Sequence, residues 1–354
     1  MLRHSRSTAA LLTAFAVVVS ACSTRLEATQ ATTIPSVPTS VAAADVECTV
    51  SPRLVPTCGA WLGTSVPSLD GTFDPVVGLA EYIDATGHDP DIVHLYERGG
   101  SAFPRTDQLE LVRRDGQDRM FYFSWKPSVE LTWRQVADGG ADDAIDTVAR
   151  SLTEFGEPLF LTVFHEPEND VVATPLSGMT TTDYVDMYRH VVTRLRDAGV
   201  DNAVFVMTYM GFERWSTIVD ELYPGDDVVD WIGYDPYGRL TDEGFGDFID
   251  RPDGESWPGF YSWATSKAPG TPIMLAEWGY DLGGHVESPD LLAGATGTLR
   301  DQFPEIAALV YWNGLGERVD ARLAADTDLA SRFATAYGQF AADPYFDQSD
   351  ARRP

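Results

Sequence analysis

Residues Leu159–Asp170 read LFLTVFHEPEND. Apolar and β-branched residues run without interruption from Leu159 to Phe164, which is typical of a parallel strand that helices cover on both faces. The run ends abruptly in His165 and Glu166. Either the strand reaches the surface there, or carboxylates are held at the rim of a pocket. The rest of the sequence must decide between these two interpretations.

Seven further short apolar runs recur along the chain, with amphipathic helical patterns between them. The predicted strands are Gly59–Gly63, Asp91–Tyr96, Met120–Trp125, Leu159–Phe164, Ala203–Tyr209, Val228–Tyr234, Pro272–Trp278 and Ile306–Trp312. The clearest helical pattern has Thr181 or Thr182 as its N-cap and ends at Gly199. This alternation predicts an α/β protein with a single (β/α)8 TIM barrel. An open doubly wound sheet is the alternative, but the GTSVPS that follows the first strand is not a GxGxxG phosphate loop.

The composition restricts the partners of this protein. The formal net charge is −29, and Lys126 and Lys267 are the two lysines. Such an acidic chain is a poor candidate for binding nucleic acid or an anionic membrane surface through a basic patch. We expect a monomer without a nucleic-acid partner.

The N-terminal residues predict export. Arg3 and Arg6 precede an apolar segment, Ala9–Val19, that is too short to span a bilayer. Val19-Ser20-Ala21-Cys22 then resembles a bacterial lipobox, which is cleaved before the cysteine and lipidated on it. We predict a lipoprotein signal peptide over residues 1–21 and a lipid anchor on Cys22, with an ordinary secretory signal as the alternative. The protein would be anchored to the cell membrane or extracellular.

Three further regions follow the signal peptide. Residues 22–47 are rich in Ser, Thr, Ala and Pro and predict a flexible tether. Cys48 and Cys58 lie near the start of the next region, and a disulfide between them is the natural interpretation in an exported chain. Two thiols with no histidine nearby make a metal site unfavourable. We expect residues 48–345 to form the barrel domain and residues 346–354 to form a C-terminal tail.

The carboxyl ends of the strands build the active site of a (β/α)8 barrel. At these ends the sequence places carboxylates, tyrosines and tryptophans, among them Trp125 as a candidate substrate contact. Two carboxyl groups facing one another in an aromatic pocket suit the cleavage of glycosidic bonds, because one can act as a proton donor while the other is an ionised nucleophile or base.

The strand ends also resemble those of the clan A glycoside hydrolases, most closely family 26, whose best-known members are β-mannanases. The resemblance implies that Glu166 is the acid/base and Glu277 the nucleophile of a retaining β-glycoside hydrolase acting on a polysaccharide, with no cofactor. It also assigns contacts with the substrate or the nucleophile to His165, Asp235, Tyr237 and Trp312.

One departure from the family pattern bears on specificity. Family 26 mannanases usually continue His-Glu with Met-Asn and an aromatic-rich loop, whereas Pro167 and Glu168 follow here, without a tryptophan. The subsite next to the acid/base therefore differs, and β-mannan and other β-glycans remain open as substrates. Glu168 is the alternative acid.

Two other functions are alternatives. One is a surface-tethered carbohydrate-binding lipoprotein without catalysis, against which both glutamates argue. The other is a metal-dependent barrel hydrolase, but none of the six histidines is paired and the first strand contains none.

Overall fold

The computed structural model describes residues 48–66, 74–238, 244–254, 256–283, 292–316 and 318–348, which lie in one compact unit of the chain. The predicted signal peptide and tether, including Cys22, lie outside these residues. In the described ranges, no helix has both the length and the apolar character that a membrane span requires.

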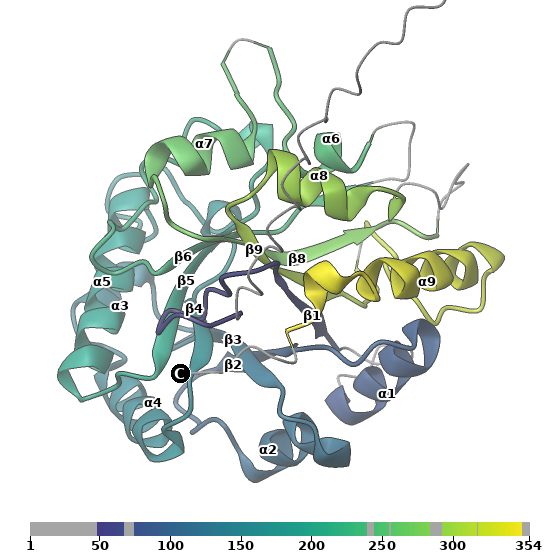
Figure 1. The fold of residues 1–354 in the computed structure, drawn as a ribbon. Helices are drawn as coiled ribbons and strands as arrows, with labels where there is room; N and C mark the ends of the chain where they lie inside the picture. Colours follow the sequence, from purple (N-terminus) through teal and green to yellow (C-terminus); the bar gives the residue numbers. More distant parts are fainter. Residues whose placement is uncertain are drawn as a thin grey trace, which may run out of the picture. The chain divides into compact units, whose positions relative to one another are not determined.

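Eight parallel strands form a closed barrel, which confirms the predicted fold (Figure 1). Each strand pairs with its neighbours in the order β6-β5-β4-β3-β2-β1-β9-β8, and pairing of β6 with β8 closes the ring. A ninth strand, β7, is two residues long and pairs with the end of β8. The strands are β1 Trp61–Ser65, β2 Ile92–Arg98, β3 Met120–Lys126, β4 Leu159–Val163, β5 Ala203–Tyr209, β6 Trp231–Tyr234, β7 Tyr237–Gly238, β8 Ile273–Tyr280 and β9 Ile306–Trp312.

Helices surround the strands, as Figure 1 shows. The α-helices are α1 Pro75–Thr86, α2 Thr106–Val112, α3 Trp133–Ala137, α4 Asp142–Phe155, α5 Thr181–Asp197, α6 Phe245–Ile249, α7 Phe260–Lys267, α8 Ala295–Gln302 and α9 Asp328–Ala341. Short 3-10 helices are η1 Arg114–Gly116, η2 Pro167–Asn169, η3 Glu213–Trp215 and η5 Pro344–Phe346. Several α-helices end as their sequences indicate; α4, for example, ends at Gly156 in the left-handed conformation with φ 70°.

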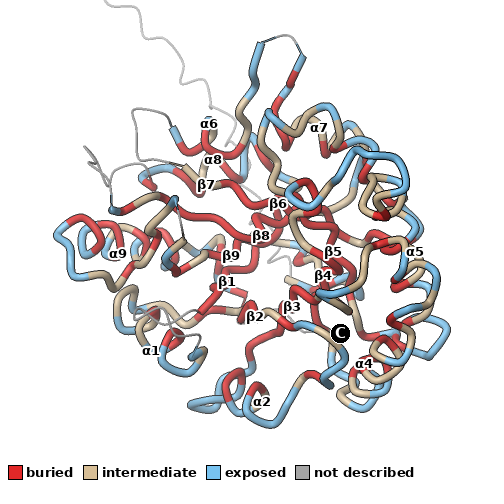
Figure 2. Tube along the Cα trace, turned by 180° about the vertical axis from the view of Figure 1, so that it is seen from behind, coloured by how far each residue is buried: buried red, intermediate tan, exposed pale blue. Residues whose placement is uncertain are grey.

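The barrel separates two apolar regions, and the strands between them are buried (Figure 2). The larger region lies between the strands and the helices. The smaller fills the inside of the barrel with side chains such as Trp61, Phe160 and Trp231. Toward the carboxyl ends of the strands the interior becomes polar: the Tyr122 hydroxyl lies 2.9 Å from that of Thr162 and 3.0 Å from that of Thr208. These polar residues lead up to the strand ends where the active site is expected.

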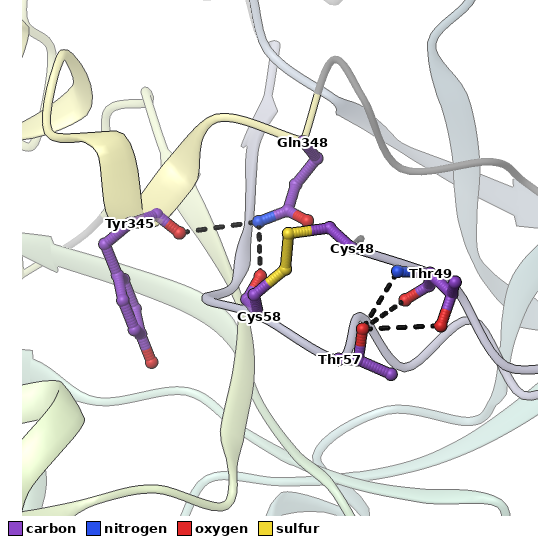
Figure 3. Close-up of a disulfide and its surroundings, with 6 residues drawn as sticks. All are labelled: Cys48, Thr49, Thr57, Cys58, Tyr345 and Gln348. Atoms are coloured by element: carbon purple, nitrogen blue, oxygen red, sulfur yellow. Dashed lines mark hydrogen bonds between the residues drawn. A yellow bond between two sulfur atoms is a disulfide. The ribbon is translucent and has the colours of Figure 1, made fainter. Parts of the chain in front are cut away.

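The opposite end of the barrel is closed by the segment that the predicted disulfide encloses. Cys48 and Cys58 are joined by a disulfide, with their Cα atoms 5.7 Å apart (Figure 3). Between them, Leu54 packs inside the barrel, and its carbonyl accepts a hydrogen bond from Trp61 Nε1 at 2.7 Å. Trp231 Nε1 donates in the same way to the Arg53 carbonyl at 2.6 Å. The disulfide therefore fastens a cap on the amino-terminal end of the barrel.

The predicted tail begins too early. Phe346 is buried against Phe340, with ring centroids 4.6 Å apart. The Gln348 side-chain amide donates to the Cys58 carbonyl at 2.9 Å. Residues 346–348 therefore pack on the barrel next to the disulfide, a contact between distant segments that local sequence does not reveal.

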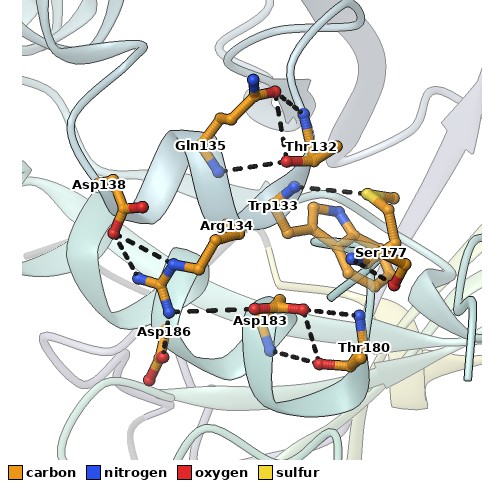
Figure 4. A network of polar contacts seen from close by, with 10 residues as sticks. Thr132, Trp133, Arg134, Gln135, Asp138, Ser177, Thr180, Asp183 and Asp186 are labelled. Atoms are coloured by element: carbon orange, nitrogen blue, oxygen red, sulfur yellow. Dashed lines mark hydrogen bonds and ion pairs between the residues drawn. The ribbon is translucent and has the colours of Figure 1, made fainter. Parts of the chain in front are cut away.

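Helices α3 and α5 are joined by polar contacts (Figure 4), and both pack near the end of β4. The Trp133 ring packs edge-on against Tyr184 of α5, 5.1 Å between centroids, and against Phe164, 6.4 Å away. Arg134 of α3 pairs with Asp186 of α5 at 2.6 Å. Phe164, the residue before His165, is thus held from outside the barrel.

The N-cap predicted for α5 is wrong by one residue. The cap is Thr180, whose hydroxyl accepts a hydrogen bond from the backbone N–H of Asp183, and neither Thr181 nor Thr182 fills this position. Three successive threonines give the same local signal. Only at Thr180 does the Asp183 side chain accept from the backbone N–H of the cap residue in return, at 3.0 Å.

Candidate active site

A tight turn at the end of β4 presents Glu166. Phe164 and Glu166 both have left-handed backbone conformations, with φ of 54° and 52°. Such conformations are unfavourable for residues other than glycine and persist where the surroundings enforce them. Here the Phe164 N–H donates to the Trp125 carbonyl and the Glu166 N–H to the Thr208 carbonyl, each at 3.0 Å. The strands on both sides of β4 therefore hold the turn in place.

A β-bulge in β8 places Glu277 in the same pocket. Leu275 pairs with Leu309 and Trp278 with Tyr311, so three steps along β8 lie opposite two along β9. The extra residue shifts the alternation of side chains, as bulges beside active sites commonly do. Ala276 lies inside the barrel, Trp278 packs outside it, and Glu277 between them lines the cleft.

Two tyrosines hold the Glu277 carboxylate. Tyr96 Oη donates to Oε1 at 2.6 Å and Tyr237 Oη donates to Oε2 at 2.7 Å. The ring of His94 lies close by, with Nδ1 3.9 Å from Oε1. Burial strongly lowers the pKa of His94, so this ring is neutral. The two phenol donors favour the ionised form of Glu277 without a positive charge beside it.

Glu166 is placed to carry the proton that Glu277 lacks. Burial and the charge of Glu168 raise the pKa of Glu166 to about 7. Burial and the charge of Glu166 likewise raise the pKa of Glu277, while Tyr96 and Tyr237 lower it. In the described part of the chain the Asn169 amide donates to Glu166 at 3.2 Å, and Asp235 also lowers the pKa of Glu166. Two carboxyl groups in one buried site titrate as a pair, and the two phenol donors favour the charge on Glu277 and the proton on Glu166.

These side chains line a cleft of about 560 Å³ at the carboxyl ends of the strands. Its walls are Tyr96, Arg98, His165, Glu166, Tyr237, Glu277, Trp312 and Val319. The rings of Tyr237 and Trp312 meet edge to face, with centroids 5.7 Å apart. The structure thus brings together five residues that the sequence predicts for the site: His165, Glu166, Tyr237, Glu277 and Trp312.

One predicted substrate contact, Trp125, is wrong, and Asp235 lies beside the glutamates without exposure to the cleft. Trp125 is fully buried between the barrel and its helices, where it packs against Phe103 and donates to the Gly99 carbonyl at 2.9 Å. Asp235 is also fully buried and lies beneath the surface of the cleft. Burial and the charges of Glu277 and Glu166 raise the pKa of Asp235 well above its ordinary range, so this side chain is a neutral acid.

His165 lines the cleft as a neutral ring. Burial, and then the positive charges of Lys126 and Arg98, lower its pKa to about 3. Its Nδ1 atom is buried and has no hydrogen-bond partner in the described part of the chain.

The sequence of β2 also contains a signal for Tyr96. His94 and Tyr96 alternate with Val93 and Leu95 before the strand ends in Glu97 and Arg98. Polar residues two positions apart share one face of a strand, and here that face is the barrel interior.

In the described ranges, no three or more His, Cys, Asp or Glu side chains form a group that could hold a metal ion.

The fold and the cleft define a (β/α)8 barrel with paired carboxyl groups and aromatic walls. Residues 139–250 match the model of glycosyl hydrolase family 26. A solved structure of a ruminal GH26 endo-β-1,4-mannanase superimposes with a TM-score of 0.54 at 18% identity, over 81% of this chain and 64% of that one. The chain is a relative of family 26 within clan A of the glycoside hydrolases.

Sequence relatives act on different glycans, as their names state. A β-1,3-xylanase of a Vibrio species is 36% identical over 104 residues, which are 28% of this chain and 21% of the relative. Endoglucanase H of Acetivibrio thermocellus is 22% identical over 299 residues, which are 81% of this chain and 31% of the relative. The chain thus matches less than a third of the length of either relative.

Proposed function

We propose that this protein is a retaining β-glycoside hydrolase that cleaves a polysaccharide. The observation that carries the proposal is the Glu277 carboxylate, which is held by two phenol donors in the same cleft as Glu166. An ionised carboxyl group beside a protonated one is the pair that double displacement requires.

The two glutamates divide the reaction between them. Glu277 attacks the anomeric carbon while Glu166 donates its proton to the departing glycosidic oxygen. This step leaves a glycosyl group bonded to Glu277 and an ionised Glu166. Glu166 then takes a proton from water, whose oxygen attacks the anomeric carbon and releases Glu277. Trp312 offers an aromatic face to a sugar ring in the cleft.

The substrate that we propose is a neutral β-glycan. The strong negative charge of the chain disfavours acidic polysaccharides, because like charges repel one another at the cleft. Relatives that act on β-1,3-xylan, and by name on glucan, support testing those polymers before β-mannan. Reducing ends released from β-1,3-xylan, mixed-linkage glucan, β-1,4-xylan and β-mannan would identify the substrate.

Two substitutions test the roles of the glutamates. We expect Glu277→Ala to abolish turnover of every substrate. Glu166→Ala should lower kcat on polysaccharide by about 10²–10⁴-fold, because it removes proton transfer alone. An aryl glycoside with a good leaving group should still react in Glu166→Ala, and added azide should restore its turnover by replacing the activated water.

Three results would contradict the assignment. Glu166→Ala with full activity on polysaccharide would point to Glu168 as the acid. An initial product of inverted configuration, seen by ¹H NMR, would exclude double displacement, which needs carboxyl groups about 5–5.5 Å apart. A wild-type protein that binds one of the polymers but releases no sugar would be a carbohydrate-binding lipoprotein instead.

We also propose that the protein is exported and anchored through lipid on Cys22. The lipobox-like Val19-Ser20-Ala21-Cys22 after a short apolar segment supports this proposal. A Cys22→Ala variant should move from the membrane fraction to the soluble fraction. A variant that stays in the membrane fraction would show that something other than Cys22 anchors the protein.

A further inference from the structure

Glu168 is a buried carboxyl group that the proposed reaction does not use. Its exposed fraction is 1%. Oε1 accepts hydrogen bonds from two backbone N–H groups, that of Met210 at 2.9 Å and that of Gly211 at 3.4 Å. Oε2 is buried too and finds no hydrogen-bond partner among the residues that the structure describes. Burying a carboxyl group in this way costs free energy, so its position calls for a reason.

The contacts of Glu168 tie the turn after β4 to the segment after β5. Glu168 lies in η2, two residues after Glu166, and the Glu166 N–H already donates to Thr208 of β5. The segment after β5, which supplies the two N–H donors, is itself closely packed. Gly211 has φ +73°, and a Cβ there would approach Phe260 and Tyr234 to 3.0 Å. The two N–H donors are therefore fixed, and Glu168 anchors the turn against them.

We propose that Glu168 is a positioning residue for the acid/base: its carboxylate holds the turn that carries Glu166, and its negative charge favours the protonated form of Glu166. This inference rests on the proposed function for its effect on the rate, but its effect on the protonation of Glu166 is independent of any substrate. At the position of Glu168 the family 26 pattern has asparagine, which could anchor the turn but carries no charge.

The charged and titratable groups that face Glu168 come from several elements. They are Glu166 in the same turn, Asp235 after β6, Arg214 in η3, and the phenols of Tyr184 in α5 and Tyr209 in β5. Burial raises the pKa of Glu168 to about 7, while its own backbone N–H, those of Met210 and Gly211, and Arg214 lower it.

Glu168 accepts hydrogen bonds from the backbone N–H groups of Met210 and Gly211, and these bonds favour its ionised form. Glu168 therefore ionises first as the pH rises, and its charge then holds the proton on Glu166 to higher pH.

The test is a ¹³C NMR titration of glutamate carboxyl groups in the wild type and in Glu168→Gln. Glutamine keeps the shape and one acceptor oxygen but not the charge. We expect the pKa of Glu166 to fall by about 0.5–1 unit. Asp170→Asn is the matched control: it removes an exposed carboxylate near Glu166, and its effect should be smaller and vanish in 0.5 M salt, since salt screens exposed charges.

A reciprocal measurement covers the case in which Glu168→Gln does not fold. Linkage requires that Glu166→Gln lower the pKa of Glu168 by the same amount. An unchanged pKa of the partner in either variant overturns the inference.

Kinetics separate this inference from the proposed function. In Glu168→Gln, the alkaline limb of kcat/KM on polysaccharide should move to lower pH together with the NMR value, while the acidic limb stays. A shift in the NMR titration in a protein that hydrolyses no glycan would refute the proposed function but not the inference. An active enzyme with neither shift would refute the inference alone. If Glu168→Gln loses polysaccharide activity and azide restores turnover of an aryl glycoside, Glu168 is the acid itself and the positioning role is wrong.

Discussion

Each oxygen of the Glu277 carboxylate accepts one phenol hydrogen, from Tyr96 and from Tyr237. A nucleophile needs its charge, yet a cation paired directly with it would hold that charge back from the anomeric carbon. Two neutral donors lower the pKa of Glu277 while they leave a negative charge to attack. They also fix the direction of the carboxylate, which is a requirement for in-line displacement.

Removal of either phenol should therefore weaken Glu277 in its proposed role as nucleophile. We expect Tyr96→Phe and Tyr237→Phe each to lower kcat/KM by about 10–100-fold, because a hydrogen bond to a charged group is worth about 1.5–3 kcal/mol. The pKa of Glu277 should rise, so the acidic limb of the pH profile should move to higher pH. Initial rates over the range of pH would measure both effects.

Tyr122→Phe is the control for these two variants. Tyr122 lies deeper in the barrel, where its hydroxyl contacts Thr162 and Thr208. Its loss should lower thermal stability and leave the acidic limb in place. An acidic limb that does not move in either Tyr96→Phe or Tyr237→Phe would contradict the role assigned to these phenols.

Single residues also show where sequence reasoning reaches its limit. Trp125 and Trp312 are the last apolar residues of β3 and β9, and the local sequence does not show in which direction either side chain points. In the structure Trp125 faces the helices and Trp312 faces the cleft. A strand buried on both faces has no polar alternation from which to read the direction of a side chain. Glu277 faces the cleft because of the bulge in β8, and the sequence of β8 does not predict this bulge.

At the scale of elements, the existence of each barrel strand was predictable but some of its ends were not. The ranges Ala203–Tyr209 and Ile306–Trp312 are confirmed to the residue. The strand predicted from Val228 begins only at Trp231, although Val228 and Val229 are 3% and 2% exposed. Apolar sequence reports burial, whereas a strand is defined by backbone pairing. The two differ where a loop is buried.

The cap at the amino-terminal end of the barrel gives a prediction at this scale. Replacing Cys48 and Cys58 by serine should lower the free energy of unfolding by about 2–3 kcal/mol, because the disulfide closes a short loop in the unfolded chain. The cap fills the barrel at the end opposite the cleft, so kcat should remain unchanged. Urea unfolding and initial rates on the same samples would test both statements. Equal stability of the two proteins would show that Trp61 and Trp231 hold the segment without the disulfide.

At the scale of the whole molecule, the cleft is a concentration of buried carboxyl groups. Glu166, Glu168, Asp235 and Glu277 all have raised pKa values, chiefly through burial. The folded state therefore binds protons more tightly than the unfolded chain at these positions. For the three glutamates this contribution to stability is present in full below their ordinary pKa, about 4.3, and is lost as the pH rises through about 7. The carboxyl groups that the proposed function requires therefore lower the free energy of unfolding at neutral pH.

Two buried histidines change the stability with pH in the opposite direction. Burial lowers the pKa of His88 to about 4 and that of His165 to about 3. The unfolded chain binds these protons more tightly, so this part of the stability is lost as the pH falls below about 6.5. Over the range between about 4.3 and 6.5 the two sets oppose one another, and the pH profile of the wild type alone cannot separate them.

The difference between the wild type and Glu277→Gln isolates the carboxyl cluster. Glutamine keeps the size of the side chain and never ionises, so the variant should match the wild type near pH 4.5 and exceed its free energy of unfolding at pH 8. The gain should be on the order of 2–4 kcal/mol, as expected for a pKa raised from about 4.3 to about 7. Glu110→Gln on the exposed surface of α2 is the control and should leave the profile unchanged. Urea unfolding from pH 4.5 to 8 measures the difference. A variant that is less stable than the wild type at pH 8 would mean that the bonds from Tyr96 and Tyr237 stabilise the ionised carboxylate by more than its burial costs.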